Sequence, residues 1–370
     1  MLTKTRPERS RRDAAPDRAL IHPGVLRYLG EIGGIIRPSA LRGETLPQLS
    51  VSTRPIDGPS AWVRRDVRPE DWRVELDAAC LDEIRRVVDE LRAYPLPTIV
   101  LGADDFAMPA CREAMARARG ILARGVRFAI VERLPMTEMN AAEATAIYWL
   151  LSSMIARPVA QKLDGALIYD VLDTGQQALP GSGVRPDKTN IEIRFHNDNA
   201  YNETPPDYVG LLCLRRAMSG GHSRVISFHT THNALLARCP ERLARLYEPF
   251  WFDRQREFHA GECPIFAAPV FDMGAEIKAR FSAHQIHAGY ALRGEPPDPE
   301  GAAAVTAMLD IFDDDALSVD FNLEPGQMQF VDNRALGHSR TAFVDHPEPA
   351  ARRHLVRLWL RDGGRRAYPG

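Results

Sequence analysis

The chain has 370 residues, of which 45% are hydrophobic and 26% are charged. This ordinary composition supports a sizeable core, and sheet-rich barrels with insertions reach this length as one domain. The formal net charge of −2 leaves no basic surplus that would favour nucleic acid as a partner. No apolar run approaches the roughly 18 residues that a membrane-spanning helix requires. We therefore expect neither nucleic acid nor a membrane as the partner.

The five cysteines are scattered along the chain and form no Cys-x-x-Cys pair. This argues against a disulfide framework and a cysteine-based zinc site, and it favours free thiols in a reducing compartment. Residues 1–20 are charged, contain proline and lack the apolar stretch of a secretory signal. We predict a disordered basic arm at residues 1–20, a single domain at 21–370 and a cytoplasmic location.

The N-terminal part of the domain, about residues 21–125, is predicted to be largely helical. Residues 78–93 carry apolar side chains three and four positions apart, which is typical of an amphipathic helix. Similar patterns predict helices at 110–123 and 141–155, and Thr137 is the candidate cap of the latter.

From about residue 126 to 362 the sequence changes to short apolar segments separated by proline and glycine turns. Strands are predicted at 126–131, 166–172, 208–214, 223–228, 264–271, 277–282, 317–323, 327–331 and 354–361. Helices are predicted at 231–238, 241–247 and 302–311. The pattern is typical of an antiparallel barrel or jelly roll packed against helices, so the predicted fold class is α+β, mainly β.

One segment of this region, residues 191–201, is predicted to be a strand that runs into a turn. It carries His196 and Asp198, and alternate residues of a strand point to the same face. His338 lies far downstream, just after the strand predicted at 327–331. Two imidazoles and one carboxylate form the ligand set of a non-haem Fe(II) oxygenase. We therefore predict that these three side chains meet at one metal site.

Other polar residues of these segments could support such a site. Asn333 and Arg340 flank His338 and could orient a ligand from behind. Arg357 lies between apolar residues of the last strand, and a buried arginine needs a partner because an unpaired charge is costly there. A bound dicarboxylate would supply that partner, and Ser223, which opens a strand after two glycines, could share it.

Taken together, these motifs resemble the taurine dioxygenase / clavaminate synthase-like family over roughly residues 125–362. The resemblance is carried by His196-Asn197-Asp198, Gly220-Gly221-His222-Ser223, the segment 333–343 around His338, and the segment 353–360 with Arg357. Asn197 departs from the Thr or Ser that is usual between the first two ligands, but that position is not itself a ligand.

The resemblance implies a double-stranded β-helix, or jelly-roll, core and the cofactors Fe(II), 2-oxoglutarate and O2. It implies His196, Asp198 and His338 as iron ligands, and Arg357 with Ser223 as the clamp for the distal carboxylate of 2-oxoglutarate. The implied activity is hydroxylation of an unactivated C–H bond of a small molecule, with release of succinate and CO2. Related halogenases lack the carboxylate ligand, so Asp198 favours hydroxylation, while desaturation, epoxidation and cyclisation stay open.

The substrate is less well defined by the sequence. By alternation Glu192 and Arg194 share the face of His196, so they could meet charged groups of a small, amino-acid-like substrate or natural-product intermediate. Alternatively, they pair with each other or lie at a solvated barrel mouth. Asn199 and Tyr201 follow the ligand motif and are candidate residues of the pocket rim.

Two interpretations from other classes remain. A zinc hydrolase could use the same three side chains, but it would need a general base and would leave Arg357 without a role. A jelly-roll binding protein would use them only structurally. A further histidine pair, His229 and His232, lacks a third ligand in the sequence, so we interpret these residues as ordinary polar positions.

Overall fold

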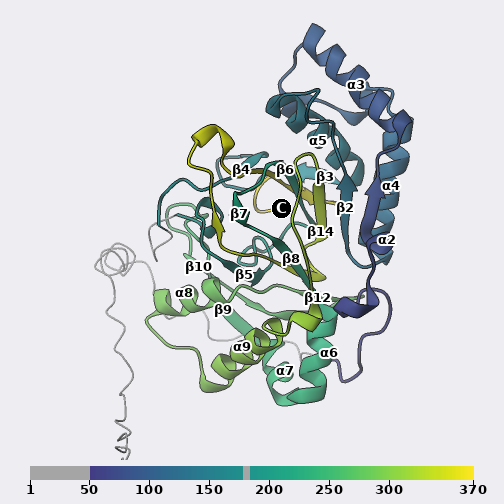
Figure 1. The fold of residues 1–370 in the computed structure, drawn as a ribbon. Helices are drawn as coiled ribbons and strands as arrows, with labels where there is room; N and C mark the ends of the chain where they lie inside the picture. Colours follow the sequence, from purple (N-terminus) through teal and green to yellow (C-terminus); the bar gives the residue numbers. More distant parts are fainter. Residues whose placement is uncertain (1–50, 178–183) are drawn as a thin grey trace, which may run out of the picture.

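The computed structural model describes residues 51–177 and 184–370, so the arm predicted at 1–20 lies outside the described residues. Two sheets form the centre of the fold (Figure 1). The larger sheet contains, in spatial order, β1 (Arg73–Glu75), β2 (Phe128–Glu132), β14 (Met328–Asp332), β6 (Tyr208–Arg215), β17 (His354–Arg361) and β3 (Arg157–Val159), with β4 (Tyr169–Val171) also paired to β17. The smaller sheet contains β13 (Ser318–Phe321), β8 (Ser223–Ser227), β15 (Leu336–Arg340) and β5 (Ile193–His196).

Short two-stranded ribbons extend this core. They are β9 (Pro249–Asp253) with β10 (Ile265–Pro269), β11 (Phe271–Met273) with β12 (Ile277–Ala279), and β7 (Ser219–Gly220) with β16 (Phe343–Val344). All pairs in the two main sheets are antiparallel except β1 with β2. The predicted fold class, a jelly-roll core flanked by helices, is confirmed.

One layer of helices covers the outer face of the larger sheet (Figure 1). It contains α3 (Ala78–Ala93), α4 (Pro109–Arg124) and α5 (Ala141–Ile155), preceded by the short α2 (Pro69–Trp72). Their apolar stripes pack on strand residues such as Leu212, Phe330 and Leu358. The helices predicted at 78–93 and 141–155 have the predicted bounds. The cap of α5 is Asn140 rather than the predicted Thr137, because the Asn140 side chain accepts from two backbone N–H groups of the first turn.

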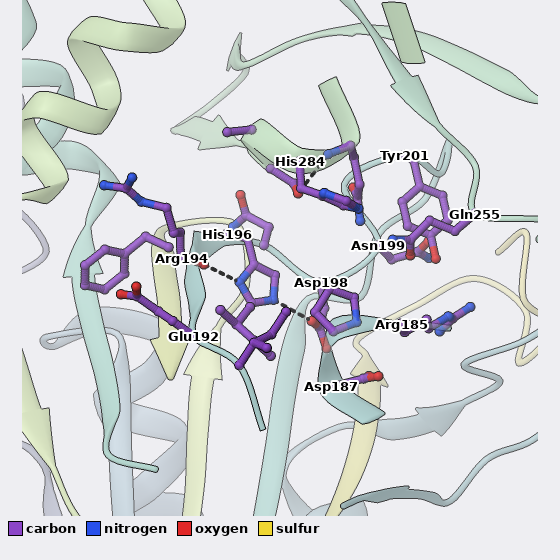
Figure 2. Close-up of a pocket in the computed structure, with 18 of the residues that line it drawn as sticks. Arg185, Asp187, Glu192, Arg194, His196, Asp198, Asn199, Tyr201, Gln255 and His284 are labelled. Atoms are coloured by element: carbon purple, nitrogen blue, oxygen red, sulfur yellow. Dashed lines mark hydrogen bonds and ion pairs between the residues drawn. The ribbon is translucent and has the colours of Figure 1, made fainter. Parts of the chain in front are cut away.

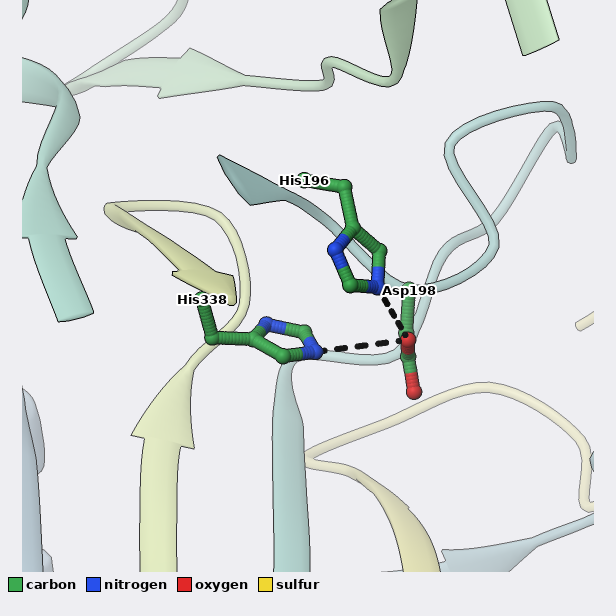
Figure 3. Close-up of side chains that lie close together, drawn as sticks. All are labelled: His196, Asp198 and His338. Atoms are coloured by element: carbon green, nitrogen blue, oxygen red, sulfur yellow. Dashed lines mark ion pairs between the residues drawn. The ribbon is translucent and has the colours of Figure 1, made fainter. Parts of the chain in front are cut away.

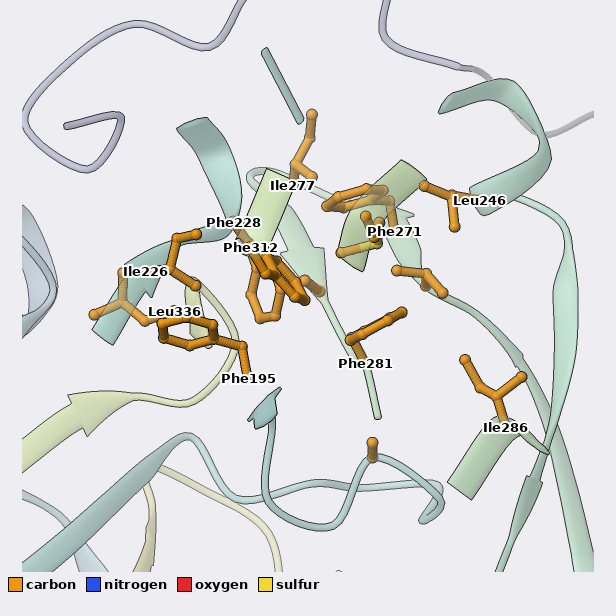
Figure 4. Packing of buried hydrophobic residues seen from close by; sticks show 14 of the residues in the cluster. Phe195, Ile226, Phe228, Leu246, Phe271, Ile277, Phe281, Ile286, Phe312 and Leu336 are labelled. Atoms are coloured by element: carbon orange, nitrogen blue, oxygen red, sulfur yellow. The ribbon is translucent and has the colours of Figure 1, made fainter. Parts of the chain in front are cut away.

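A second group of helices packs beside the smaller sheet: α6 (Phe228–Arg238), α7 (Pro240–Leu246), α8 (Ala283–Arg293) and α9 (Pro299–Phe312). Phe312, the last residue of α9, lies at the centre of an aromatic cluster (Figure 4). Its ring centroid is 5.5 Å from that of Phe195, 5.4 Å from that of Phe281 and 6.0 Å from that of Phe228. Because Phe195 on β5 points into this cluster, its neighbour His196 points to the opposite side of the strand.

Several elements of this half were not predicted, and β15 and α8 are the ones that bear on the site. β15 has the sequence Leu-Gly-His-Ser-Arg and is buried throughout, so it lacks the apolar alternation on which a strand prediction relies. α8 contains Gly289, which lowers helix propensity. A Cβ on Gly289 would lie 2.4 Å from the backbone oxygen of Trp251, so the glycine permits close packing of α8 on β9. Among the described residues, no helix is long and apolar enough to cross a membrane.

Candidate metal centre

The two histidines of the predicted site face each other across neighbouring strands. β5 and β15 pair antiparallel, with His196 directly opposite His338. Side chains at directly opposed positions lie on the same face of a sheet and close together. The ring centroids are accordingly 4.4 Å apart. The sheet register therefore brings together two residues that are far apart in the sequence.

A network of side-chain amides positions Asp198 in the turn after β5. Asn333 accepts from the backbone N–H of Asp198 at 2.9 Å and donates to its carbonyl oxygen at 3.0 Å. Asn197 donates to the backbone oxygens of Asn333 and Leu336, and it accepts from the backbone N–H of Phe281 at 2.7 Å. These bonds tie the turn after β5 to the turn between β14 and β15, with Asn333 bonded to the backbone of Asp198.

The three predicted ligand side chains converge (Figure 3). Asp198 Oδ1 is 3.4 Å from Nε2 of His196 and 3.4 Å from Nε2 of His338. The candidate ligand atoms all lie within 4.8 Å of one another, and no other group of three such residues is found in the described parts of the chain. His196 Nδ1 lies 2.9 Å from the backbone oxygen of Arg194, which directs Nε2 toward the cluster. Two nitrogens and one oxygen are a donor set that fits Fe(II).

The second carboxylate oxygen of Asp198, Oδ2, contacts two other side chains of the protein. The indole N–H of Trp359 donates to Oδ2 at 2.7 Å, and Nη1 of Arg357 is 3.1 Å from the same atom. Oδ1 is therefore the oxygen left to face a metal. Burial raises the pKa of Asp198, but Arg357 and the two imidazoles outweigh it and hold this pKa well below its usual value. The carboxylate is thus charged without a metal.

The pKa of His338 is lowered, although pairing with a carboxylate would by itself raise it. Burial and the neighbouring His196 lower it, and Asp198 only partly offsets them. A neutral imidazole keeps its lone pair, which is the form that binds a metal.

Two cavities meet at this cluster. The outer cavity, of about 250 Å³, is lined by both ends of the metal motif, by the residue range 185–187 and by the start of α8 (Figure 2). The inner cavity, of about 50 Å³, lies between the two sheets and is lined by His338, Ser223, Arg340, Arg353 and Arg357, among others. Arg357 lines both cavities.

The inner cavity is lined by arginines, and some of their N–H groups have no hydrogen-bond partner in the described structure. Arg340 Nε and Nη1 and Arg353 Nη1 are buried and have no hydrogen-bond partner among the described residues. Burial and their mutual repulsion lower the pKa of Arg340 to about 9, and burial lowers that of Arg353 to about 10. Two guanidinium groups in this position favour an anion between them.

Arg357, the predicted clamp, already contacts two carboxylates. Besides Asp198, its Nη1 is 3.0 Å from Asp187 Oδ2, and its Nε donates to Gln161 at 2.8 Å. Only Nη2 is buried without a partner in the described structure. Burial lowers the pKa of Arg357, but the two carboxylates outweigh it and raise this pKa above its ordinary value.

The predicted substrate residues all line the outer cavity, but they differ in exposure. Glu192 and Arg194 are exposed at its rim, and Arg194 pairs with Asp313 on α9's C-terminal side rather than with Glu192. Asn199 and Tyr201 are buried on the other side of His196 (Figure 2).

Trp359 and Arg353 were not among the predicted site residues. Trp359 is two residues from Arg357 on the last strand, so alternation would have indicated it. Arg353 precedes that strand, beyond a register shift at His354/Leu355, so alternation does not reach it.

A jelly-roll core that holds two imidazoles and one carboxylate beside open cavities defines a non-haem iron oxygenase. The comparisons with known proteins agree. The chain belongs to the taurine catabolism dioxygenase TauD, TfdA family, whose model matches residues 92–359. It is therefore an Fe(II)- and 2-oxoglutarate-dependent oxygenase.

Similar proteins include the FR-33289 synthase of Streptomyces rubellomurinus, which is 27% identical over 87% of this chain and 94% of its own length. The L-asparagine oxygenase of Streptomyces coelicolor is 29% identical over 49% of this chain and 50% of its own length. Among solved structures, one is asparagine oxygenase in complex with Fe(II), hydroxyasparagine and succinate. It has a TM-score of 0.59 and 23% sequence identity to this chain, and the match covers 79% of this chain and 94% of the asparagine oxygenase chain. This structural likeness shows a shared fold.

Proposed function

We propose that the chain hydroxylates an unactivated C–H bond of a small molecule, with His196, Asp198 and His338 as its iron ligands. The observation that carries this proposal is the convergence of two Nε2 atoms and one carboxylate oxygen in the described structure. Bound Fe(II), with 2-oxoglutarate and O2, supplies the oxidant that removes the substrate hydrogen, and succinate and CO2 are released. Desaturation, epoxidation and cyclisation begin with the same hydrogen removal and are the alternative outcomes.

The inner cavity supports a modified proposal for the 2-oxoglutarate clamp. Arg357 has two carboxylate neighbours, whereas Arg353 and Arg340 have unpartnered N–H groups beside Ser223. We propose that Arg353, with Ser223 and Arg340, binds the distal carboxylate. Arg357 then lies between the two cavities and holds Asp198 and Asp187 in place.

The chain's own residues have three tasks in this reaction. Trp359 and Arg357 hold Asp198 so that Oδ1 faces the metal. Leu211, Leu355 and Val171 line the inner cavity with apolar groups, which limits water beside the co-substrate. The outer cavity holds the substrate next to the metal, and Glu192, Arg194, Asn199 and Tyr201 are the residues that we propose contact it.

The comparisons support a small polar substrate. The curated relatives are named as a synthase of FR-33289 and an oxygenase of L-asparagine. We propose an amino-acid-like molecule or a natural-product intermediate for this chain, and a cytoplasmic location in keeping with its free cysteines.

The test measures succinate formed from 2-oxoglutarate by the Fe(II)-loaded protein, with candidate substrates present and absent. Succinate should form with Fe(II), and His196→Ala should abolish it. Turnover that requires Zn(II) in place of Fe(II) would support a hydrolase instead. If neither metal binds, the site is structural and the proposal fails.

A further inference from the structure

The outer cavity has a wall that the metal and the co-substrate do not use: the N-terminal turn of α8. Ser282 caps this helix by accepting from the backbone N–H of Gln285. The N–H groups that begin a helix have no partner within it. No acidic side chain lies in the first turn of α8. Because peptide dipoles add along a helix, this end carries a partial positive charge that favours an anion.

Two buried side-chain amides line this cavity, and each has one polar atom without a hydrogen-bond partner in the described parts of the chain. Gln285 is 7% exposed, and its Oε1 has no hydrogen-bond partner in the described residues. Asn199 is 3% exposed; its Oδ1 accepts from Tyr368, while its Nδ2 has no partner there. Both side chains line the outer cavity. Because a buried polar group without a partner is costly, two of them beside one cavity indicate a polar ligand group.

The amide of Gln285 suits an anion despite its unpaired oxygen. A half-turn about the last side-chain bond exchanges its oxygen and nitrogen, which have nearly the same shape. Gln285 Nε2 can then donate to a ligand, and Nδ2 of Asn199, which has no partner among the described residues, is available for the same purpose. The imidazole of His284 lies at the same cavity and adds a further donor (Figure 2).

The position of this turn relative to the metal centre is fixed. Phe281 and Asn197 are joined by two hydrogen bonds, from the Asn197 N–H to the Phe281 oxygen at 2.9 Å and from the Phe281 N–H to Asn197 Oδ1 at 2.7 Å. Asn197 lies between His196 and Asp198, so the entry to α8 is tied directly to the metal motif. A ligand group bound at α8 is therefore held at a set position from the metal.

We propose that the first turn of α8, with His284, Gln285 and Asn199, binds an anionic group of the substrate. This inference rests on the proposed function and assigns a substrate class to the same site. The acidic group anchors one end of the molecule, and the carbon to be hydroxylated lies toward the metal. A neutral amide or an amine at that end is disfavoured.

The test compares four short probes of similar length that differ in their terminal group: propylphosphonate, butanoate, butanamide and butylamine. Each is titrated calorimetrically into the Fe(II)-loaded protein saturated with 2-oxoglutarate under anaerobic conditions. The two anions should bind about tenfold or more tightly than butanamide, because hydrogen bonds to a charged group are the stronger ones. Butylamine should not bind. Comparison of propylphosphonate with butanoate then distinguishes the two anion chemistries.

The variants His284→Ala and Gln285→Met test the residues themselves. Each should weaken binding of the anions by about tenfold and leave butanamide unchanged. His287→Ala, on an exposed position of the same helix, is the matched control and should change nothing. Because Gln285 is buried and its variant could destabilise the fold, His284→Ala provides the independent measurement.

The two proposals fail in different ways. The charge-transfer absorption of 2-oxoglutarate bound to Fe(II) reports the proposed function, and its persistence during titration shows that no probe has displaced the co-substrate. If the absorption forms but butanamide binds as tightly as the anions, or if neither α8 variant weakens anion binding, the anion site is refuted alone. If the absorption never forms, the proposed function is refuted, and the calorimetric ranking of probes still decides the anion site.

Discussion

Two pairs of histidines in the described part of the chain lie close to the core, and the pairs differ in what their rings contact. At the barrel mouth, His196 and His338 both direct Nε2 at the carboxylate of Asp198. On α6, His229 bonds to Ser60 Oγ at 2.8 Å and to the backbone oxygen of Ile277 at 2.9 Å, and His232 bonds to the Tyr247 hydroxyl at 2.8 Å.

The difference between the pairs lies in what their ring nitrogens face. His229, His232 and His338 are buried and His196 is partly buried. His229 and His232 are three residues apart on a helix, a spacing that could serve a metal. On α6 neutral neighbours already use the nitrogens, with the exception of His232 Nδ1. At the mouth, both imidazoles direct a nitrogen at the same carboxylate, and nearby arginines have N–H groups without partners in the described structure. Burial and spacing therefore do not define a metal site; convergence on an anionic ligand does.

The largest expected effect separates the two pairs directly. His338→Ala removes one of three ligands, so iron binding should be lost and succinate formation should fall by roughly a thousandfold or more. His229→Ala should retain iron and lower the free energy of unfolding by about 2–3 kcal/mol, because it leaves a cavity and unpaired groups. Metal content after anaerobic loading and urea denaturation measure the two effects. Equal iron loss in both variants would remove the distinction.

The next effect concerns pH and the α6 pair. Burial lowers the pKa of His232 from its ordinary value of 6.5 to about 4. Between these values the unfolded chain binds more protons than the folded chain, so stability should fall as pH drops from 6.5 to 4. The contribution of His232 is up to about 3 kcal/mol.

Urea denaturation of the wild type and of His232→Phe at pH 7.5, 5.5 and 4.5 checks this expectation. Phenylalanine does not titrate and keeps the ring against Tyr247 and Phe271. The variant should therefore show a smaller loss of stability on acidification. Parallel pH curves for both proteins would contradict the assignment.

These contrasts also show how far the sequence determines the site. His196 and Asp198 were proposed because they lie two residues apart at the end of a predicted strand, and His338 followed from the chemistry of the ligand set. In the structure the strand ends at His196, and Asp198 lies in the turn that follows. The strand that carries His338 was missed because β15 is polar yet buried on both sides, so no alternation marks it.

The partners of each charged residue depend on tertiary contacts that local patterns do not contain. Arg357 was expected to have a bound dicarboxylate as its partner. In the structure it contacts Asp187, which lies 170 residues earlier in the chain and is brought close only by the fold. Arg353 lies just before the last strand and was overlooked, because alternation does not reach it across the register shift at His354/Leu355. Helix α8 was missed because its apolar face is weak and interrupted by Gly289.

A smaller effect is expected from the residue that orients the carboxylate at the mouth. Trp359→Phe replaces the indole with a smaller aromatic ring and removes the N–H that donates to Asp198 Oδ2. Loss of such a supporting bond typically weakens metal binding by about 10–100-fold. Iron affinity, measured by competition with a chelator, should fall. The smaller ring also leaves a cavity at this buried position, so the unfolding midpoint should fall as well, and iron affinity is the measurement that reports the lost N–H. The contrast with α6 would weaken if iron affinity stayed the same, because Oδ2 would then need no fixed donor.

The smallest expected effect distinguishes Arg353, which lies just before the last strand, from Arg357, which lies within it. Arg353→Lys removes a planar, two-pronged donor from the inner cavity, so the KM for 2-oxoglutarate should rise by about tenfold, with little change in kcat at saturation. Arg357→Lys disturbs the contacts with Asp198 and Asp187 instead, so it should lower iron affinity and kcat more than it raises that KM. If Arg357→Lys gave the larger rise in KM, the distal carboxylate would belong to Arg357, and Arg353 would be a buried cation with a structural role. The split between KM and kcat thus shows which of the two guanidinium groups binds the co-substrate and which one orients the metal ligand.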